Sequence, residues 1–387
     1  MVWKEVLRRL NPFSRVGASL GRGVLSAAAL RRVMDRERGR AERTGRQFSL
    51  VAFDLPVAEN GDEGGGRGRL VERLAGALSR RVRRTDVVGW LDGDRLGVVL
   101  TDTAAAGAHS LADETAALLI EADRRPRYTV YVFPPKWRTP GQGSAGRCKN
   151  GGQRGAAGAE SGGSGPTEER LEPLLAARIP SWKRATDVVV AGAALVILGP
   201  LILLCALLIK LFSPGPALFR QMRIGLGGRP FELVKLRSMR AGSDAGVHRQ
   251  HLSALIGSDV PMEKLQRDPR VFALGNLLRR TCIDELPQLV NVLRGEMSLV
   301  GPRPCLPYEA EEYARWHSRR FDIAPGMTGL WQVIGKNSLS FAKMVRLDIA
   351  YARMLSPWLD LKILLKTPLT VLAGMLPGRR GAKGDGR

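Results

Sequence analysis

The N-terminal part of the chain alternates short runs of β-branched and aromatic residues with longer stretches in which apolar positions recur every three or four residues. The short runs indicate strands and the longer stretches predict helices. The expected strands lie in QFSLVAFDLP, DVVGWLDGDRLGVVLT and RYTVYVF, and the expected helices lie around residues 26–44, 68–84 and 104–123. Strands that alternate with helices in this way predict an α/β sandwich domain over residues 26–134.

One apolar stretch stands out, DVVVAGAALVILGPLILLCALLIKLF, which carries no charge between Asp187 and Lys210. Its length approaches what a helix needs to cross a hydrocarbon core of roughly 30 Å, so we predict a membrane helix over residues 186–212. Gly199 and Pro200 lie at its middle, where proline removes a backbone donor and should kink the helix. Basic residues flank both ends, so both flanks look cytoplasmic. A kinked, re-entrant helix fits both observations, whereas a straight spanning helix fits only the length. A buried core helix does not fit a run that is apolar on all sides.

Three further segments are expected to contribute no core. Residues 135–180 are rich in Gly and Ser and nearly free of large apolar side chains, which predicts a disordered linker. Residues 1–25 form a basic segment without the long apolar core of a secretory signal, and residues 376–387 form a basic tail. The remaining residues, 181–375, are expected to form a mostly α-helical, membrane-associated catalytic domain.

Composition indicates an anionic partner. The net charge is +23, with 60 Lys and Arg residues against 37 Asp and Glu residues. This balance suits nucleic acid, anionic lipid headgroups or a phosphorylated substrate. No helix-turn-helix, zinc-finger or aromatic–basic pattern is present, so nucleic acid is not expected as a partner. The four cysteines show neither metal-ligand spacing nor a disulfide framework, which fits a reducing cytoplasmic setting.

The segment with the densest chemistry is RRTCIDELPQLVNVLRGEMSLVGPRP, residues 279–304. Thr281 precedes Asp284 by three residues, an N-capping spacing that would place Asp284 and Glu285 in the first turn of a helix. An isolated Asp-Glu pair is usually solvated surface, but here the two acids could flank one site, one as nucleophile and the other as metal ligand. A carboxylate that meets a diphosphate needs charge relief from Mg²⁺ and from arginines. The candidate arginines are Arg270, Arg279, Arg280 and Arg303.

The C-terminal domain resembles the bacterial sugar transferases, the monotopic polyprenyl-phosphate hexose-1-phosphate transferases, also called phosphoglycosyl transferases. The resemblance runs from Lys183 to about Thr370, through KRATDVVVAG, SPGPALFRQMRIG, FELVKLRSM, DPRVFALGNLLRRTCIDELPQLVNVLRGEMSLVGPRP, PGMTGLWQV and LDIAYARMLSPWLDLKILLKT. Several independent motifs in the same order make this resemblance specific.

The resemblance implies a role for each matching residue. Asp284 would attack the sugar-linked phosphate of a UDP-sugar and expel UMP, and Glu285 would bind Mg²⁺. Arg279 would contact phosphate, and Arg303 of GPRP would shape the substrate-binding end of the site. Gly199 and Pro200 would form the kink of a re-entrant membrane helix, where many relatives have Ser-Pro. The remaining matching positions, without a defined role, are Lys235, Arg237 and Asp268.

The resemblance also implies where the enzyme works and with which partners. The covalent phosphosugar would pass to undecaprenyl phosphate at the bacterial inner membrane, with the catalytic domain facing the cytoplasm and membrane lipid as a partner. The product would initiate an exopolysaccharide, a capsule or an O-antigen-type glycan, with a hexose-1-phosphate favoured over an acetamido sugar. Trp331, Trp358 and the segment that follows Trp358 would lie at the interface or pack as an ordinary helix. A homodimer fits this expectation, although no motif specifies it.

The N-terminal domain resembles the diguanylate cyclase (GGDEF) domain, including the segment RERGRAERTGRQFSLVAFD. Where that family has its signature turn this chain has LDGDRL, so Arg95 stands at an acidic position and the two-glycine turn is absent. Asp54 could match a metal-binding aspartate but cannot hold metals alone. The resemblance therefore implies a degenerate, non-cyclising domain, and an unrelated small α/β domain is the alternative. For the whole chain, the alternative function is a nucleotide-sensing, membrane-anchored regulator with an inactive transferase scaffold.

Overall fold

The computed structural model describes most of the chain in two compact units. The described residues are 24–55, 66–118, 126–134, 168–239, 254–256, 258, 260–261, 271–335 and 338–375. Within them, the boundary between the N-terminal and C-terminal units falls between Leu171 and Glu172. The segment 1–23, most of the predicted linker and the basic tail lie outside the described residues.

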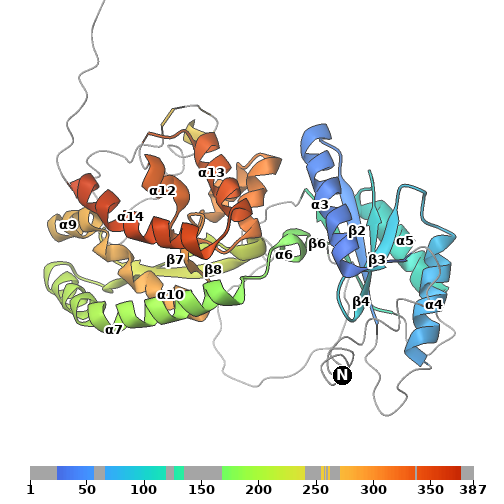
Figure 1. The fold of residues 1–387 in the computed structure, drawn as a ribbon, viewed down its shortest axis with the longest axis horizontal. Coiled ribbons are helices and arrows are strands. Elements are labelled where there is room, and N and C mark those ends of the chain that lie inside the picture. The colour runs from blue at the N-terminus through green and yellow to red at the C-terminus, as the bar shows by residue number, and fades with distance from the viewer. Residues whose placement is uncertain are drawn as a thin grey trace, which may run out of the picture. The chain divides into compact units, whose positions relative to one another are not determined.

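The N-terminal unit is built on a six-stranded sheet with the order β1-β3-β4-β2-β5-β6. Its central strand β2 runs antiparallel to both β4 and β5. Helix α3 lies on one side of the sheet, and α4 and α5 lie on the other (Figure 1). Its elements are β1 (Val24–Leu25), α3 (Ala27–Thr44), β2 (Phe48–Asp54), α4 (Gly66–Ser79), β3 (Val87–Trp90), β4 (Arg95–Leu100), α5 (Ala105–Ala117), β5 (Tyr128–Phe133) and β6 (Glu168–Arg170).

Strand β2 is buried on both faces because helices cover both sides of the sheet. All of its residues except Asp54 are buried. Val51 and Phe53 belong to the core cluster that includes residues of α4 and α5, and alternation along the strand turns Leu50 and Ala52 to the opposite face. The predicted α/β sandwich over residues 26–134 is therefore present, with all three predicted strand regions and all three predicted helices.

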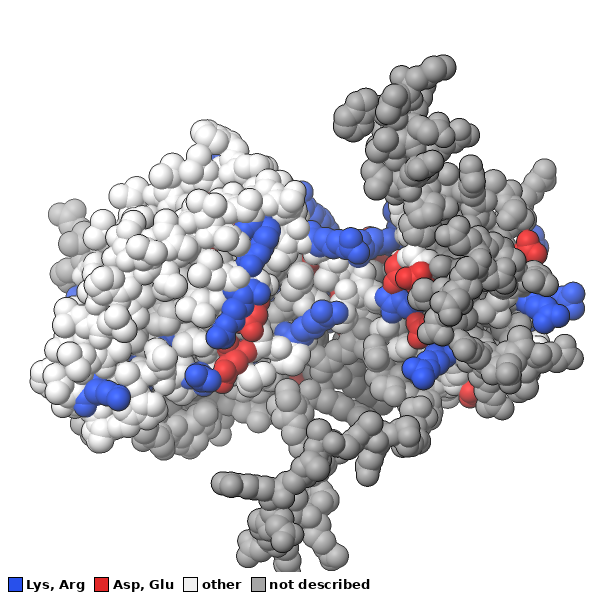
Figure 2. Space-filling model, turned by 90° about the horizontal axis from the view of Figure 1, so that it is seen from below, with Lys and Arg blue, Asp and Glu red and all other residues white. Residues whose placement is uncertain are grey.

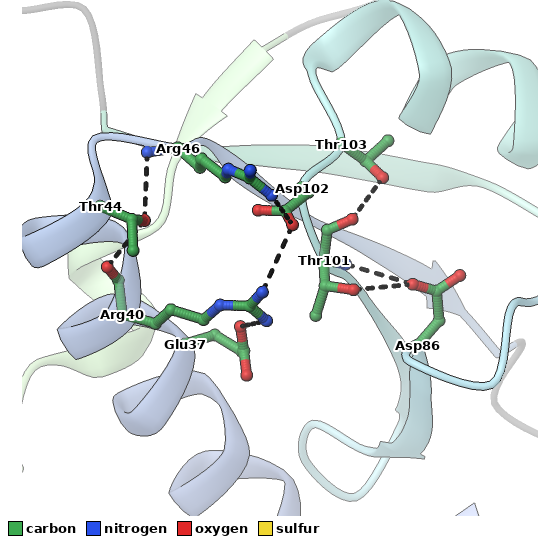
Figure 3. Close-up of polar contacts among 8 residues, drawn as sticks. All are labelled: Glu37, Arg40, Thr44, Arg46, Asp86, Thr101, Asp102 and Thr103. Carbon is green, nitrogen blue, oxygen red and sulfur yellow. Dashed lines mark hydrogen bonds and ion pairs between the residues drawn. The ribbon is translucent and has the colours of Figure 1, made fainter.

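The turn between β4 and α5 is fixed by polar contacts rather than by glycine. Asp102 adopts a left-handed backbone conformation with φ 50°, and its carboxylate pairs with Arg46 at 3.0 Å and Arg40 at 3.5 Å. Next to it, Asp86 accepts hydrogen bonds from the backbone N–H and the hydroxyl of Thr101, at 3.2 and 3.3 Å (Figure 3). These contacts connect α3, the turn before β3 and the end of β4, and so stabilise one edge of the unit.

The structure changes the predicted end of the linker. Strand β6 pairs in parallel with β5, and helix α6 (Glu172–Leu175) begins the C-terminal unit. Both lie inside the range 135–180 that composition predicted to be disordered, so that prediction is wrong for residues 168–180. The pairing partner of β6 is more than thirty residues away in sequence, which is why local composition gave no sign of this strand.

The C-terminal unit is mostly helical, as predicted, around two small sheets. Strands β7 and β8 form an antiparallel hairpin, and β9 pairs in parallel with β10. In Figure 1, the β7–β8 hairpin and α10 lie between α7 on one side and α14 on the other. The elements after α6 are α7 (Ser181–Phe212), β7 (Leu218–Ile224), η1 (Leu226–Gly228), β8 (Pro230–Leu236), α9 (Ala273–Thr281), η2 (Ile283–Gln288), α10 (Leu289–Arg294), β9 (Ser298–Val300), α11 (Pro307–Glu311), η3 (Arg315–Asp322), β10 (Gly326–Thr328), α12 (Leu330–Gly335), α13 (Phe341–Arg353) and α14 (Pro357–Met375).

Helix α7 begins five residues before the predicted membrane segment and ends at the predicted residue, Phe212. It is continuous through Gly199 and Pro200, and Figure 1 shows it bending toward its C-terminal end. One stripe of this helix packs against the unit near both ends. Ala191 belongs to a core cluster with residues of α10 and β9, while Cys205 and Ile209 pack with residues of β8 and α9. Both halves of the apolar helix therefore contact the same unit.

Buried polar groups anchor the first turns of α7. Lys183 is fully buried, forms an ion pair of 2.6 Å with Asp360 and donates to the carbonyl of Val300 at 3.0 Å and the Tyr351 hydroxyl at 3.1 Å. One turn later, Asp187 accepts hydrogen bonds from the hydroxyl of Ser298 and the backbone of the next residue. These bonds connect α7 to β9, α13 and α14.

The outward faces of α7 and α14 are apolar. Within the described residues, α7 is the one helix long and apolar enough to cross a membrane by length and composition. Figure 2 shows the face on which α7 lies, and large parts of the C-terminal unit there carry no charged side chain. The large exposed apolar residues on these two helices include Val189, Val196, Ile197, Leu203, Leu204, Leu207, Leu211 and Phe212 of α7, and Trp358, Leu361, Leu365, Leu369 and Leu372 of α14.

The two tryptophans predicted at an interface differ. Trp358, at the start of α14, is exposed, as an interfacial side chain would be. Trp331 is buried in a cluster with Phe341, Met344 and Val345, so the interfacial prediction was wrong for it. Its helix α12 packs against α13 and α14, and this tertiary packing decides the burial of an otherwise suitable anchor residue.

Candidate active site

Asp284 and Glu285 lie in η2, a short 3₁₀ helix between α9 and α10. Both carboxylates are in its first turn, as predicted, but Thr281 does not cap it. Thr281 is the last residue of α9, and its hydroxyl donates to the carbonyls of Leu277 and Leu278. The reversal after α9 is made instead by Cys282, which has φ 57°. η2 begins directly after Cys282, and Asp284 in its first turn is buried.

Lys235 lies on β8, the strand that packs against η2, and is near the two carboxylates. The side chain is half-buried, and its pKa is lowered to about 8, first by burial and then by the charge of Arg223. The charges of Asp284 and Glu285 act in the opposite direction, and Arg303 lowers the pKa further. Electrostatic influence of this kind requires short separations, so these five charged groups surround one site.

Arg223 on β7 is the most buried cation of this group. Its guanidinium donates to the carbonyl of Pro304 at 3.0 Å and to the side-chain oxygen of Gln221 at 2.8 Å. Burial and the nearby Arg303 lower its pKa. Because a guanidinium stays charged in proteins, Arg223 gives the site a permanent positive charge next to that of Arg303, an arrangement suited to binding an anionic ligand.

The Gly301–Pro304 turn is held by close backbone packing. The amide of Gly301 donates to the carbonyl of Thr328, and the amide of Gly326 donates to that of Pro302, both at 2.8 Å. A Cβ added to Gly301 would come within 2.3 Å of the carbonyl oxygen of Ala324, which no side chain can accommodate. The PGMTG segment, which is distant in sequence, therefore packs against the GPRP turn and holds it in place.

Two buried arginines hold the backbone carbonyls of Arg303 and Pro304. Arg223 binds the carbonyl of Pro304, and Arg320 donates to the carbonyl of Arg303 at 3.0 Å. Arg320 is itself held by a fully buried ion pair of 2.7 Å with Asp348. The side chain of Arg303 is exposed and close enough to affect the pKa of both Lys235 and Arg223. Arg303 therefore lies close to Lys235 and Arg223, and its role in shaping the substrate-binding end of the site stays a prediction.

The structure does not bring every predicted residue to the carboxylates. Arg279 is half-buried in the last turn of α9, next to η2. Arg280 is exposed and donates to the carbonyl of Met375 at the end of α14, at 3.1 Å, so it points elsewhere. Arg237 is buried and holds the loop after α7 through the carbonyls of Ser213 and Pro214, both at 2.6 Å.

The other predicted positions divide into two groups. Gly199 and Pro200 lie inside α7 and belong to the membrane prediction rather than to the polar site. Arg270 and Asp268 lie outside the described residues.

Sequence reasoning missed Arg223 as a site residue. Arg223 is one of the basic residues that flank the apolar run, and no motif assigned it a role at the site. The signal was available, because LFRQMRI alternates as a strand and places Phe219, Gln221 and Arg223 on one face. A charged residue at the end of that face, followed by a glycine turn, is a candidate for a buried ligand-binding cation.

The carboxylate pair fits a magnesium ion only if a ligand completes the coordination. Within the described residues, no group of three or more His, Cys, Asp or Glu side chains could hold a metal ion. Mg²⁺ is usually bound through one or two carboxylates plus substrate phosphates and water. Asp284 and Glu285 supply that number of protein ligands, and the cations around them suit the phosphates.

Comparison with known proteins agrees with this chemistry. The family described as bacterial sugar transferase matches residues 178–374. The chain is 43% identical over 208 residues to the UDP-glucose:undecaprenyl-phosphate glucose-1-phosphate transferase of Caulobacter vibrioides, covering 52% of this chain and 73% of that protein. It is 44% identical over 166 residues to the galactosyl transferase CpsE of Streptococcus agalactiae, covering 41% of this chain and 35% of that protein. The chain thus spans about a third of the second relative.

The N-terminal unit has weaker similarity to solved structures. A GGDEF-domain structure from Pseudomonas aeruginosa aligns with 18% identity and a TM-score of 0.24, covering 29% of this chain and 72% of that chain. Similarity at this level carries no conclusion about what the unit binds. In the structure, Arg95 pairs with Asp92 and donates to the Tyr131 hydroxyl, and Asp54 is exposed at the end of β2.

Proposed function

Because the chain belongs to the bacterial sugar transferase family, we propose that it moves a sugar-1-phosphate from a UDP-sugar to undecaprenyl phosphate and releases UMP. The chain is a sugar phosphotransferase by family, and the names of its relatives suggest this donor and this acceptor. The observation that carries the proposal is the grouping of two carboxylates with Lys235, Arg223 and Arg303 at one site.

In the first step, a carboxylate oxygen of Asp284 attacks the sugar-linked phosphorus of the donor. A new bond forms between that oxygen and phosphorus, and the phosphoanhydride bond breaks, so that UMP leaves with the electron pair. Carboxylates act as nucleophiles of this kind in aspartyl-phosphate enzymes. The burial of Asp284 supports this role, because the nucleophile must be held in one orientation and shielded from water.

In the second step, a phosphate oxygen of undecaprenyl phosphate attacks the same phosphorus. The acyl-phosphate bond breaks, the carboxylate of Asp284 is restored, and the product is a polyprenyl diphosphate sugar. Lys235, Arg223 and Arg303 bind and orient the phosphates in both steps, since fixed cations stabilise the charge of a transferring phosphoryl group.

We propose Glu285 as the residue that would hold Mg²⁺, with Asp284 beside it. When bound, Mg²⁺ supplies neutralisation of the diphosphate charge. Glu285 is half-buried and adjacent to the nucleophile, while the remaining coordination positions are left for water and substrate oxygens.

We further propose that α7 is a re-entrant membrane helix and that the enzyme works at the cytoplasmic face of the bacterial inner membrane. A helix that crossed the bilayer would carry its two ends to opposite sides, but both halves of α7 pack on the same unit. Its outward face and that of α14 are apolar, as required for contact with lipid tails. A homodimer remains a prediction.

For the transferred sugar and for the pathway that uses the product, we propose only a class. Lipid-linked sugars of this type would begin an exopolysaccharide, a capsule or an O-antigen-type glycan. The two relatives described above differ in the sugar that their names give, glucose in one and galactose in the other. A hexose-1-phosphate is therefore the favoured transferred group.

The proposal is tested in detergent-solubilised full chain with Mg²⁺ and a panel of UDP-sugars, without acceptor. We expect UMP release and a phosphosugar adduct by intact mass, both lost in Asp284→Asn. The matched control is Glu232→Gln, which changes an exposed carboxylate on the opposite face of β8 that forms an ion pair of 3.4 Å with Arg220. Adduct formation should be unchanged in this control.

Two outcomes would overturn parts of the proposal. UMP release that requires undecaprenyl phosphate, with no adduct on its own, would mean direct transfer and no covalent role for Asp284. No UMP release with any donor, with or without acceptor, would favour a membrane-anchored regulator with an inactive transferase scaffold.

A further inference from the structure

The β7 strand begins directly after the apolar helix and ends at the buried cation of the site. Six residues lie between Phe212, the last residue of α7, and Phe219. Leu211 and Phe212 are 71% and 72% exposed, and Phe219 is 41% exposed. Exposed apolar side chains therefore lie on both sides of the loop that connects α7 to β7.

The Phe219 ring lies next to a cation. In the β7–β8 ladder Phe219 pairs with Lys235, and the Lys235 ammonium lies 5.1 Å from the centre of the Phe219 ring. Side chains of directly paired residues share one face of a sheet. Phe219 thus lies along the chain between the end of α7 and the position at which β7 pairs with Lys235.

The loop that connects α7 to β7 is fixed. Arg237 donates to the carbonyls of Ser213 and Pro214, both at 2.6 Å. Gly215 lies against this guanidinium with φ 110°, and a Cβ there would approach it within 2.4 Å. The position of Phe219 relative to the end of α7 is therefore set by buried hydrogen bonds.

The two ends of the β7 face differ in chemistry. Arg223 lies four residues beyond Phe219 on the same face, a separation of about 13 Å along an extended strand. At that far end the cations are Arg223 and the exposed Arg303, with the GPRP turn. The near end combines one aromatic ring with one ammonium, which suits a molecule with a hydrocarbon chain and a single phosphate.

We propose that Phe219 and Lys235 form the acceptor subsite, in which the first isoprene units of the polyprenyl phosphate lie on the Phe219 ring. This inference rests on the proposed function. The phosphate of the acceptor lies at the Lys235 ammonium, which also contacts the sugar-linked phosphate of the donor, and the hydrocarbon chain runs over Phe219 toward Leu211 and Phe212. The nucleotide of the donor then occupies the Arg223–Arg303 end, so that donor and acceptor approach Asp284 from opposite ends of the strand.

The test separates the two half-reactions in the detergent-solubilised full chain. In Phe219→Ala, we expect the rate of UMP release without acceptor to stay within about twofold of the unmodified chain. The KM for undecaprenyl phosphate, at a fixed micelle concentration, should rise about tenfold, the factor that corresponds to ~1.4 kcal/mol of lost contact. Phe219→Leu, which keeps an apolar side chain, should recover most of this loss.

The matched control is Met222→Ala. Met222 is 42% exposed, almost the same as Phe219, but lies on the other face of β7, and its removal should leave both half-reactions unchanged. An unchanged acceptor KM in Phe219→Ala would overturn the subsite. So would an equal loss of both half-reactions, or the same KM increase in Met222→Ala. If the unmodified chain forms no adduct and releases no UMP under any condition, the proposed function fails first, and the subsite with it.

Discussion

Binding of the UDP-sugar donor should weaken when Lys235 loses its charge. This should happen at a pH well below the one at which an exposed lysine becomes neutral. Its pKa is lowered from 10.5 to about 8, chiefly by burial and next by Arg223. A lysine with a lowered pKa is charged below that value and neutral above it. Binding of the donor diphosphate should therefore be supported up to about pH 8 and weaken above it.

The size of the effect follows from the titration. With a pKa of about 8, roughly nine-tenths of the Lys235 side chains are charged at pH 7 and roughly one-tenth at pH 9. If only the charged form binds the donor, kcat/KM for the UDP-sugar should fall about tenfold between these values. The plateau of kcat should extend to higher pH, because a bound diphosphate favours the charged ammonium and raises its pKa.

The assay is the initial rate of UMP release at low UDP-sugar concentration, from pH 6 to pH 10. Lys235→Arg is the informative variant, because a guanidinium remains charged across this range. Its kcat/KM should be lower overall if the longer side chain fits poorly, but the alkaline decline near pH 8 should disappear. A decline at the same pH in Lys235→Arg, or a flat profile to pH 9.5 in the unmodified chain, would refute the reasoning.

Three further predictions concern the supports of the site. Lys183→Met should lower the free energy of unfolding by about 3–5 kcal/mol, because it leaves a buried carboxylate unpaired; thermal unfolding in detergent measures this, with the exposed Lys366→Met as control. Gly301→Ala should abolish UMP release, since its Cβ would collide with backbone atoms, whereas Gly192→Ala, where nothing lies within 4 Å, should fold and react normally. Arg223→Gln should raise the KM for the UDP-sugar more than about tenfold through loss of a charged hydrogen-bond donor. Arg223→Lys should recover part of it, and a variant that lost only thermal stability would show a structural role instead.

Much of the fold could be predicted because the decisive signals are local. The three predicted strand regions form β2, the β3–β4 hairpin and β5, since their apolar residues repeat with strand periodicity or fill a doubly covered sheet. The apolar helix ends at the predicted residue because charge and composition change sharply there. The extra strand β6 could not be predicted, since it forms only by pairing with a strand far away in sequence.

The site was predictable in its chemistry but not in its geometry. Asp284, Glu285 and Arg303 are grouped as their motifs suggested, whereas Arg280 points to the end of α14. Consecutive helical residues point about 100° apart, so Arg279 and Arg280 cannot both face η2. The packing of α9 decides which of the two arginines faces η2. The sequence also could not reveal that the reversal at Cys282 replaces the expected cap.

Helix α7 presents an apolar face outward and also packs against the core of the C-terminal unit. These two roles determine how a water-soluble form of this enzyme could be made. Deleting the helix would uncover the cores that Ala191, Cys205 and Ile209 close, and would remove the buried ammonium of Lys183. Truncation is therefore the wrong strategy. A soluble variant should keep the whole helix with its packed stripe and replace only its outward residues, such as Val196, by polar helix formers.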